Sequence, residues 1–237
     1  MTGLMLLAST GVIVVGAVLQ AATGMGTGIL VVPLLALIDL GLVPAPPVLA
    51  SMALTVPMAW HGRRHIAYTD LKTLLPSLVI GCGIGALALA SIPASEVGLI
   101  FAVVILIAVA ITAVGVRLPF NRRSLSLAAI LAGAMGASSG VGAPPIALLY
   151  QDREGPQLRP TLAFVYAASS IIILVFLAAV GRFGLHEAKL ALMLMPGYLL
   201  GLCIAAPFAR LLDGGYTRIA VLVLSAVSAV ALLVKSL

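Results

Sequence analysis

Two glycine-rich clusters carry the residue types best suited to binding an anion. The first, residues 24–28, reads Gly-Met-Gly-Thr-Gly and is followed by Pro33. The second, residues 136–142, reads Gly-Ala-Ser-Ser-Gly-Val-Gly and is followed by Pro144 and Pro145. Each cluster interrupts a long apolar stretch, so each is predicted to break a helix or to turn it back. A broken helix exposes backbone N–H groups and the positive end of its dipole, and both favour a negatively charged ligand.

Hydroxyl side chains beside the two breaks add hydrogen-bond donors. We therefore predict a substrate site between the clusters, formed by backbone N–H groups and hydroxyls. Arg159 precedes a later apolar segment. It either lies at the membrane interface or reaches the anion from the mouth of a cavity. The candidate site residues are Thr23, Gly24, Gly26, Thr27, Gly28, Ser138, Ser139, Gly140, Gly142 and Arg159. Interrupted segments at matching positions of two repeats are typical of a transporter site near the middle of the membrane.

Glycines spaced by four residues also allow helices to pack closely. We prefer this interpretation for two further pairs, Gly81 with Gly85 and Gly197 with Gly201. For the two glycine-rich clusters, the additional glycines and the prolines that follow favour a functional break.

Patterns that would indicate an enzyme or a metal site are weak. Residues 136–140 fit G-x-S-x-G, but a nucleophile elbow requires a preceding strand together with His and acidic partners. His61 and His65 have metal-ligand spacing, but arginines lie between them and a solvated helix face is the better interpretation. We expect no catalytic residue, no metal and no cofactor.

Three carboxylates lie at places where coupling to protons is conceivable. Asp70 and Glu187 begin apolar segments at corresponding positions, which favours helix N-terminal caps over proton-coupling groups. Asp39 lies inside an apolar run, and either a coupling site or an interfacial position fits it.

The elements that position these residues must be membrane helices. The 237-residue chain has only 13 Lys and Arg and 7 Asp and Glu, which is 8% charge against 62% hydrophobic residues. A soluble domain carries about 25% charge. This composition excludes a soluble enzyme, a nucleic-acid-binding protein and a disordered chain, and the helix-length apolar runs exclude a β-barrel. Cys82 and Cys203 lie within apolar segments and are expected to be buried free thiols.

The sequence repeats itself. At an offset of 112, Gly24, Gly28 and Pro33 fall on Gly136, Gly140 and Pro145, and further matches follow in order at offsets of 113 to 120. At about 20 residues per span plus loops, the chain holds about eight transmembrane segments. We therefore predict an all-α polytopic membrane protein of two homologous four-segment repeats, residues 1–119 and 120–237, with the first segment of each repeat broken or re-entrant.

The orientation of the repeats has two solutions. If the broken segments cross the membrane, the Lys and Arg residues divide 9 to 4 and the repeats are parallel. If these segments are re-entrant hairpins, the division is 10 to 3 and the repeats are inverted. Both satisfy the positive-inside rule, and both place residues 61–73 and 117–124 in the cytoplasm.

Three motifs resemble the TauE/SafE family, also called the TSUP family of sulfite and organosulfonate transporters. They are residues 24–35 (G-x-G-x-G-x4-P-L-L), residues 139–150 (S-G-V-G-A-P-P-I-A-L-L-Y) and residues 159–163 (R-x-T-L-A). The resemblance covers essentially the whole chain. Thr27 and Ala143 depart from it, because the family often has further glycines there.

The resemblance implies a multi-pass inner-membrane transporter of small sulfur-containing anions such as sulfite or sulfonates. Its partners would be the lipid bilayer and the anion, with protons or sodium ions as candidate coupling ions and with no nucleic acid. Ion-gradient-coupled export is the expected activity. A passive anion channel and a transporter of another small organic anion are the alternatives.

Overall fold

The structure is a computed structural model that describes residues 3–24, 26–115, 119–151, 155–212 and 215–236. Within these ranges the chain forms helices and no strand. The α-helices are α1 (Gly3–Thr23), α2 (Gly28–Ile38), α3 (Ala45–Ala50), α4 (Met52–His61), α5 (Tyr68–Ser91), α6 (Val97–Val114), α7 (Arg122–Ser139), α8 (Ala143–Leu149), α9 (Gly155–Ala179), α10 (Leu185–Leu212) and α11 (Gly215–Ser236). Three 3-10 turns, η1 (Leu40–Leu42), η2 (Arg63–His65) and η3 (Ala94–Glu96), connect them.

Six segments of the described chain are long and apolar enough to cross a membrane. They are Gly3–Thr23, Leu40–His61, Tyr68–Ser91, Val97–Val114, Gln157–Ala179 and Leu185–Ala205. Gly28–Ile38 and Val221–Ser236 are shorter apolar helices. The prediction of a multi-pass, all-α membrane protein is thus confirmed, whereas the count of about eight spans is not.

The outer faces of these helices suit a hydrocarbon environment. Leu87 of α5, Val175 of α9 and Leu192 of α10 are 63%, 63% and 61% exposed. When these side chains contact lipid, their apolar surface is removed from water, which stabilises the protein. Cys82 is buried as predicted, but the prediction for Cys203 was wrong, because it lies on an exposed face of α10.

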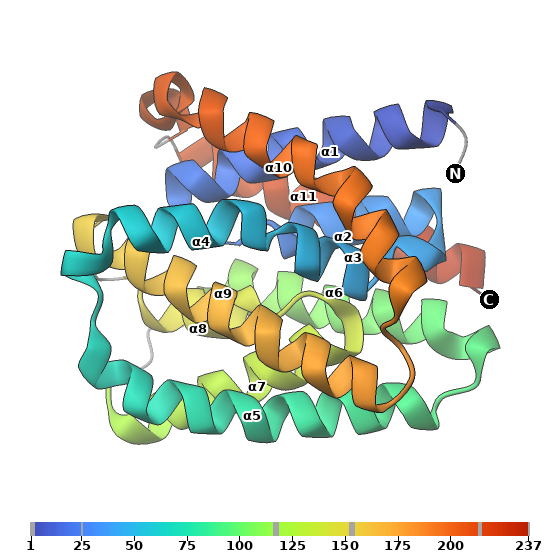
Figure 1. Ribbon diagram of the computed structural model, residues 1–237, viewed down its shortest axis with the longest axis horizontal. Helices are drawn as coiled ribbons and strands as arrows, with labels where there is room; N and C mark the ends of the chain where they lie inside the picture. Colours follow the sequence, from blue (N-terminus) through green and yellow to red (C-terminus); the bar gives the residue numbers. More distant parts are fainter. Residues whose placement is uncertain (1–2, 25, 116–118, 152–154, 213–214, 237) are drawn as a thin grey trace.

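Contacts between distant segments define two ends of the molecule. At the first, which we call the basic end, the Tyr150 hydroxyl donates to Asp70 Oδ2 at 2.7 Å, and Ala67 N donates to Thr161 Oγ1 at 3.1 Å. The exposed basic side chains there are Arg63, Arg64, Lys72, Arg122 and Arg123. This end includes the connection from α4 to α5, which lies at the left of Figure 1.

The opposite end carries fewer basic groups. Arg182 donates to the carbonyls of Leu89 and Ile92 at 3.4 Å, and Lys235 Nζ donates to Leu37 O at 3.3 Å. Both termini lie toward this end in Figure 1.

Each broken segment folds back to the end where it began. Helix α1 starts near the opposite end, and α2 returns there to Leu37, beside Lys235. Helix α7 starts at the basic end, and α8 returns there to Tyr150. This is the hairpin arrangement, for which the sequence gives a 10 to 3 division of basic residues. Four members of that count, Arg117, Arg153 and the side chains of Arg210 and Arg218, lie outside the described part of the chain.

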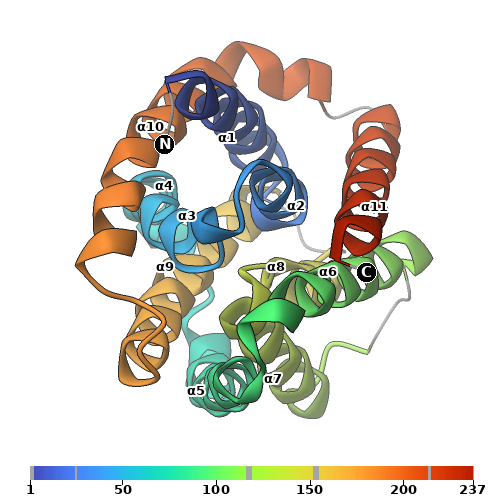
Figure 2. The ribbon, with the colours of Figure 1, turned by 90° about the vertical axis from the view of Figure 1, so that its right-hand side faces the viewer.

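If the chain repeats as predicted, α1 corresponds to α7 and α5 corresponds to α10, and the pairs of packed helices correspond as well. Helix α5 packs on α7 and α10 packs on α1, while α4 contacts α9 and α6 contacts α11. Figure 2 shows the α5–α7 and α1–α10 pairs side by side. Equivalent helices also run in opposite directions, since α5 leaves the basic end and α10 approaches it. The division into residues 1–119 and 120–237 stays a prediction.

Glycines form the two closest helix seams. A Cβ atom added at Gly81 or Gly85 of α5 would collide with the backbone carbonyls of Ile130 or Ala134 of α7. In the α1–α10 seam, an added Cβ at Gly201 would collide with Ala17 Cβ. The packing interpretation of these glycines is therefore confirmed.

Candidate functional site

The two breaks touch each other in the interior. Gly24 and Gly26 have φ values of 77° and 84°, and Gly140 has 85°, a region that side chains with a Cβ rarely adopt. A Cβ added at Gly28 would lie 2.9 Å from Gly140 O, and one added at Gly26 would collide with Ala143 Cβ. Glycine is therefore required both for the backbone turn and for the close approach of the two hairpins.

The break positions agree with the sequence prediction with one shift. Helix α1 ends at Thr23 and α2 begins at Gly28, as predicted. Gly136, however, lies inside α7, which continues to Ser139, so the second break comprises residues 140–142. A Cβ at Gly136 would lie 2.8 Å from Ile173 Cδ1, which gives this glycine a packing role.

The helix that follows the first break begins without a side-chain cap. Thr27, the N-cap residue of α2, makes no capping hydrogen bond with its side chain. The first N–H groups of a helix have no partner within it, and the helix dipole adds about half a positive charge there. This end of α2 is suited to an anion.

A small polar cavity lies where the breaks meet. Its volume is about 60 Å³, and a cavity needs about 10–15 Å³ to hold a water molecule, so a small polyatomic anion is of the right size. Helices α3, α4, α9 and α10 complete its wall. The lining residues are Gln20, Gly26, Thr27, Gly28, Val32, Pro47, Val48, Ser51, Thr55, Gly140, Gly142, Ala143, Tyr166, Ser169, Ser170, Ile173 and Tyr198. All of these described lining residues are uncharged.

Two buried tyrosines line this cavity. Tyr198, 1% exposed, interacts with the Thr27 side chain through its hydroxyl. The Tyr166 hydroxyl is buried and has no hydrogen-bond partner among the described residues. An unsatisfied buried hydroxyl costs about 1–3 kcal/mol, and such a cost is tolerated most readily where a ligand supplies the missing partner.

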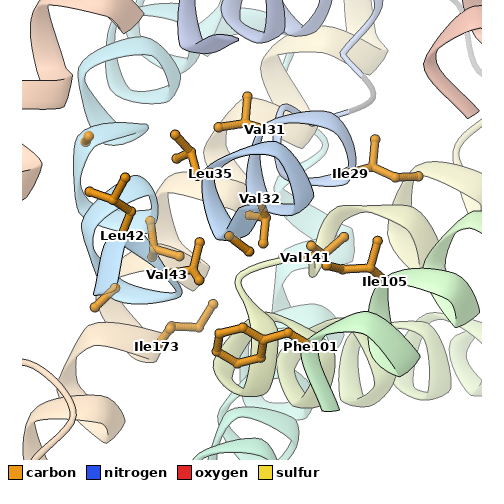
Figure 3. Packing of buried hydrophobic residues seen from close by; sticks show 14 of the residues in the cluster. Ile29, Val31, Val32, Leu35, Leu42, Val43, Phe101, Ile105, Val141 and Ile173 are labelled. Atoms are coloured by element: carbon orange, nitrogen blue, oxygen red, sulfur yellow. The ribbon is translucent and has the colours of Figure 1, made fainter. Parts of the chain in front are cut away.

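Apolar packing closes the cavity on the side of the opposite end. Val32 and Ile173 line the cavity and belong to the main buried apolar cluster. Figure 3 shows Val32 and Ile173 with Leu42, Val43 and Phe101, which lie around α2 and the start of α6. These side chains are buried and form the apolar packing on this side of the cavity.

A wider cavity of about 610 Å³ lies on the side of the basic end. Its lining residues are Pro57, Met58, His61, Gly62, Arg159, Pro160 and Leu202. They lie on or next to α4, α9 and α10, which also line the central cavity. Arg159 is seven residues from Tyr166, about 10 Å along α9, and Leu202 is four residues from Tyr198, about 6 Å along α10. The two cavities are thus stacked along the same helices.

The structure brings five of the ten predicted site residues to the central cavity. These are Gly26, Thr27, Gly28, Gly140 and Gly142. Arg159 lines the wider cavity instead. Gly24 packs on Arg159, since an added Cβ would lie 3.6 Å from Arg159 Cα.

The remaining predicted hydroxyls bond to the main chain beside the breaks. Thr23 Oγ1 donates to Leu19 O at 2.7 Å. Ser138 Oγ and Ser139 Oγ donate to Met135 O at 3.3 and 2.8 Å, and Ser139 Oγ also accepts from Val141 N at 3.3 Å. In this arrangement these side chains stabilise the ends of α1 and α7 and do not line the cavity.

Sequence reasoning missed several cavity residues. Gln20 Oε1 accepts from Thr27 N at 2.7 Å and so spans the first break. Tyr166 and Tyr198 were not predicted, nor were the hydroxyls of Ser51, Thr55, Ser169 and Ser170. A glutamine inside an apolar helix is a signal that could have identified Gln20, because polar groups at membrane depth face the protein interior.

The three carboxylates of interest have separate roles. Glu187 Oε2 accepts from Gly184 N at 2.8 Å at the start of α10, which is the predicted helix cap. Asp70 instead accepts from the Tyr150 hydroxyl and so ties α5 to the end of α8. Asp39 is exposed after α2 and accepts from Gly41 N at 2.8 Å, which fits the interfacial interpretation.

Among the described residues, no three His, Cys, Asp or Glu side chains form a group that could hold a metal ion. His61 and His65 are exposed, in agreement with a solvated helix face. Ser138 lies on a helix, and no preceding strand forms a nucleophile elbow there.

Comparison with curated proteins and with solved structures finds no match. Residues 9–232, nearly the whole chain, match the family described as "Sulfite exporter TauE/SafE". This range includes both breaks, both cavities and all six candidate spans except the first residues of α1. The protein therefore belongs to the TauE/SafE family of membrane transporters.

Proposed function

We propose that the protein is a secondary transporter of small sulfur-containing anions, such as sulfite or sulfonates, and that the substrate binds in the central cavity. The contact between the two breaks at an uncharged polar cavity is the observation that carries this proposal. N–H groups at the start of α2 and in residues 140–142 would bind the anion. The hydroxyl groups of Thr27, Tyr166 and Tyr198 would complete its coordination.

The substrate would enter from the basic end. The wider cavity with Arg159 lies on that side, while buried apolar side chains close the other. Arginine attracts an anion from a distance and is suited to the mouth of the route. If the basic end faces the cytoplasm, as the positive-inside rule indicates, loading from this side suits export across the inner membrane.

Transport would follow from movement of the α1–α2 hairpin against the α7–α8 hairpin. The two hairpins contact each other mainly through residues 26–28 and residues 140–143, so a small shift there would open the apolar side. A proton or sodium gradient would supply the driving force.

A passive anion channel is the alternative. The apolar closure between Val32, Ile173 and Phe101 argues for a gated route. Collapse of the proton and sodium gradients in proteoliposomes distinguishes the two, because a channel would continue to conduct the anion and a coupled transporter would stop accumulating it.

The site is tested by sulfite transport in proteoliposomes. Gly28→Leu places a side chain against Gly140 O and should abolish transport. Gly11→Leu on α1 is the matched control, because an added Cβ there has nothing within 4 Å. Thr27→Val removes the cavity hydroxyl at the start of α2 with little change in shape and should reduce transport in a protein that still folds. Normal transport by the Gly28 and Thr27 variants would refute the proposed site.

A further inference from the structure

We infer that the central cavity selects singly charged oxyanions over doubly charged ones, and that the Tyr166 hydroxyl donates a hydrogen bond to the bound anion. This inference rests on the proposed function and specifies the substrate class of the same site. It follows from the charges around the cavity and from the hydrogen bonds that its hydroxyls already make.

The positive charge available at the cavity is small. Every described residue that lines it is uncharged. Arg159 is the basic residue of the neighbouring cavity and lies about 10 Å along α9 from Tyr166. The start of α2 contributes about half a positive charge. This field offsets much of one buried negative charge, but it leaves a second one without compensation, and burial of an uncompensated charge is strongly unfavourable.

Most of the cavity hydroxyls have already used their hydrogen atom. Ser51 Oγ donates to Val48 O at 2.8 Å, and Thr55 Oγ1 donates to Ser51 O at 3.1 Å. Ser169 Oγ and Ser170 Oγ both donate to Tyr166 O, at 3.0 and 2.9 Å. Each hydroxyl has one hydrogen, so these four groups have only lone pairs left for a ligand. A dianion would therefore meet acceptors along the walls formed by α4 and α9.

The Tyr166 hydroxyl differs from these four groups. The tyrosine side chain is 9% exposed and lines the cavity, and its hydroxyl has no partner among the described residues. The edge of its ring lies next to the first break, since Cε2 would be 3.7 Å from a Cβ added at Gly26. Its O–H is thus a donor held at the place where the hairpins meet.

Small sulfur oxyanions differ in charge. Simple alkyl sulfonates such as methanesulfonate carry one charge and sulfate carries two, while sulfite passes from the singly charged hydrogen sulfite to the dianion near neutral pH. Tyr166 and Tyr198 are the titratable groups among the described lining residues, and phenols stay neutral in this range. A group of the wider cavity, such as His61, would affect both ligands alike, so a change of affinity with pH that sulfite shows and methanesulfonate does not would report the charge of the ligand.

The test is calorimetric binding to the purified full-length protein. Methanesulfonate should bind at least about tenfold more tightly than sulfate. The affinity for sulfite should fall as pH rises through its second ionisation, while that for methanesulfonate stays constant. Tyr166→Phe should weaken methanesulfonate binding by about ten- to a hundredfold, the range of one hydrogen bond to a charged group. Tyr68→Phe, at an exposed tyrosine of the basic end, is the control and should bind normally.

The possible failures are distinct. Equal affinity for sulfate and methanesulfonate would overturn the charge selectivity. Unchanged binding by Tyr166→Phe would overturn the role of the hydroxyl. Neither result would contradict transport through this cavity. Absence of binding by every anion, together with normal transport by Gly28→Leu, would overturn the proposed function itself.

Discussion

In the seam between α5 and α7, Gly81 and Gly85 lie within a continuous helix and let it contact the backbone of α7. At the first break, Gly24 and Gly28 have the same spacing but end one helix and start another, and at the second break Gly140 ends α7. Gly24, Gly26 and Gly140 have positive φ. The seam is apolar, whereas the breaks enclose the polar cavity. A spacing of four residues between glycines therefore specifies close approach, and the residues that follow decide whether the helix continues.

The largest effect is expected from a change in the seam. Gly81→Ala should destabilise the protein by about 1–3 kcal/mol, because the added methyl group meets the Ile130 carbonyl and backbone cannot yield as a side chain can. The melting temperature in detergent measures this. Gly83→Ala on the same helix is the control, since its Cβ would lie at an ordinary 3.4 Å from Phe176 Cε1 and alanine favours the helix. Equal melting temperatures for the two variants would contradict the assignment of the seam.

A smaller loss of stability but a larger loss of activity is expected at the second break. Gly140→Ala forces a side chain into a left-handed conformation, which costs about 1–2 kcal/mol. Gly181→Ala carries the same strain, with φ at 72°, but has open space around it. Both variants should melt at similarly lowered temperatures, and only Gly140→Ala should lose sulfite transport. If Gly181→Ala lost transport to the same degree, backbone strain alone would explain both results.

The smallest expected effect is a difference in stability between variants of two neighbouring serines. Ser139→Ala leaves Val141 N without its partner at the break and should cost about 1 kcal/mol. Ser138→Ala removes only a long bond of 3.3 Å to its own helix and should be nearly neutral. Melting temperatures of the two variants decide this. A larger effect at Ser138 would show that its hydroxyl has a second role, such as the substrate contact predicted from the sequence.

Much of the fold could be predicted because composition and periodicity are local properties. The scarcity of charge specified a membrane protein, and the interrupted apolar runs specified the breaks near Gly24 and Gly140. The start of the second break was misplaced at Gly136, since a glycine inside a helix and a glycine that ends one are alike in sequence. Only the backbone angle distinguishes them.

The candidate site was less predictable than the fold. The glycines of both breaks could be named from their pattern, and five of the ten predicted residues line the cavity. Tyr166 and Tyr198 could not be, because their proximity to the breaks depends on how α9 and α10 pack, whereas Gln20 could have been found as a polar residue inside an apolar helix. The serines beside the second break were predicted as ligand donors, yet Ser139 bonds the main chain before the break and within it.

The sequence by itself determined that this chain is a bundle of membrane helices with two glycine-rich interruptions, because the cost of burying charge and the conformational freedom of glycine act residue by residue. Only the tertiary structure decided that the interruptions touch, that each hairpin returns to its own end, and that a tyrosine hydroxyl with no partner among the described residues lines the cavity beside them. These features depend on contacts between residues far apart in the chain, and local composition contains no record of such contacts.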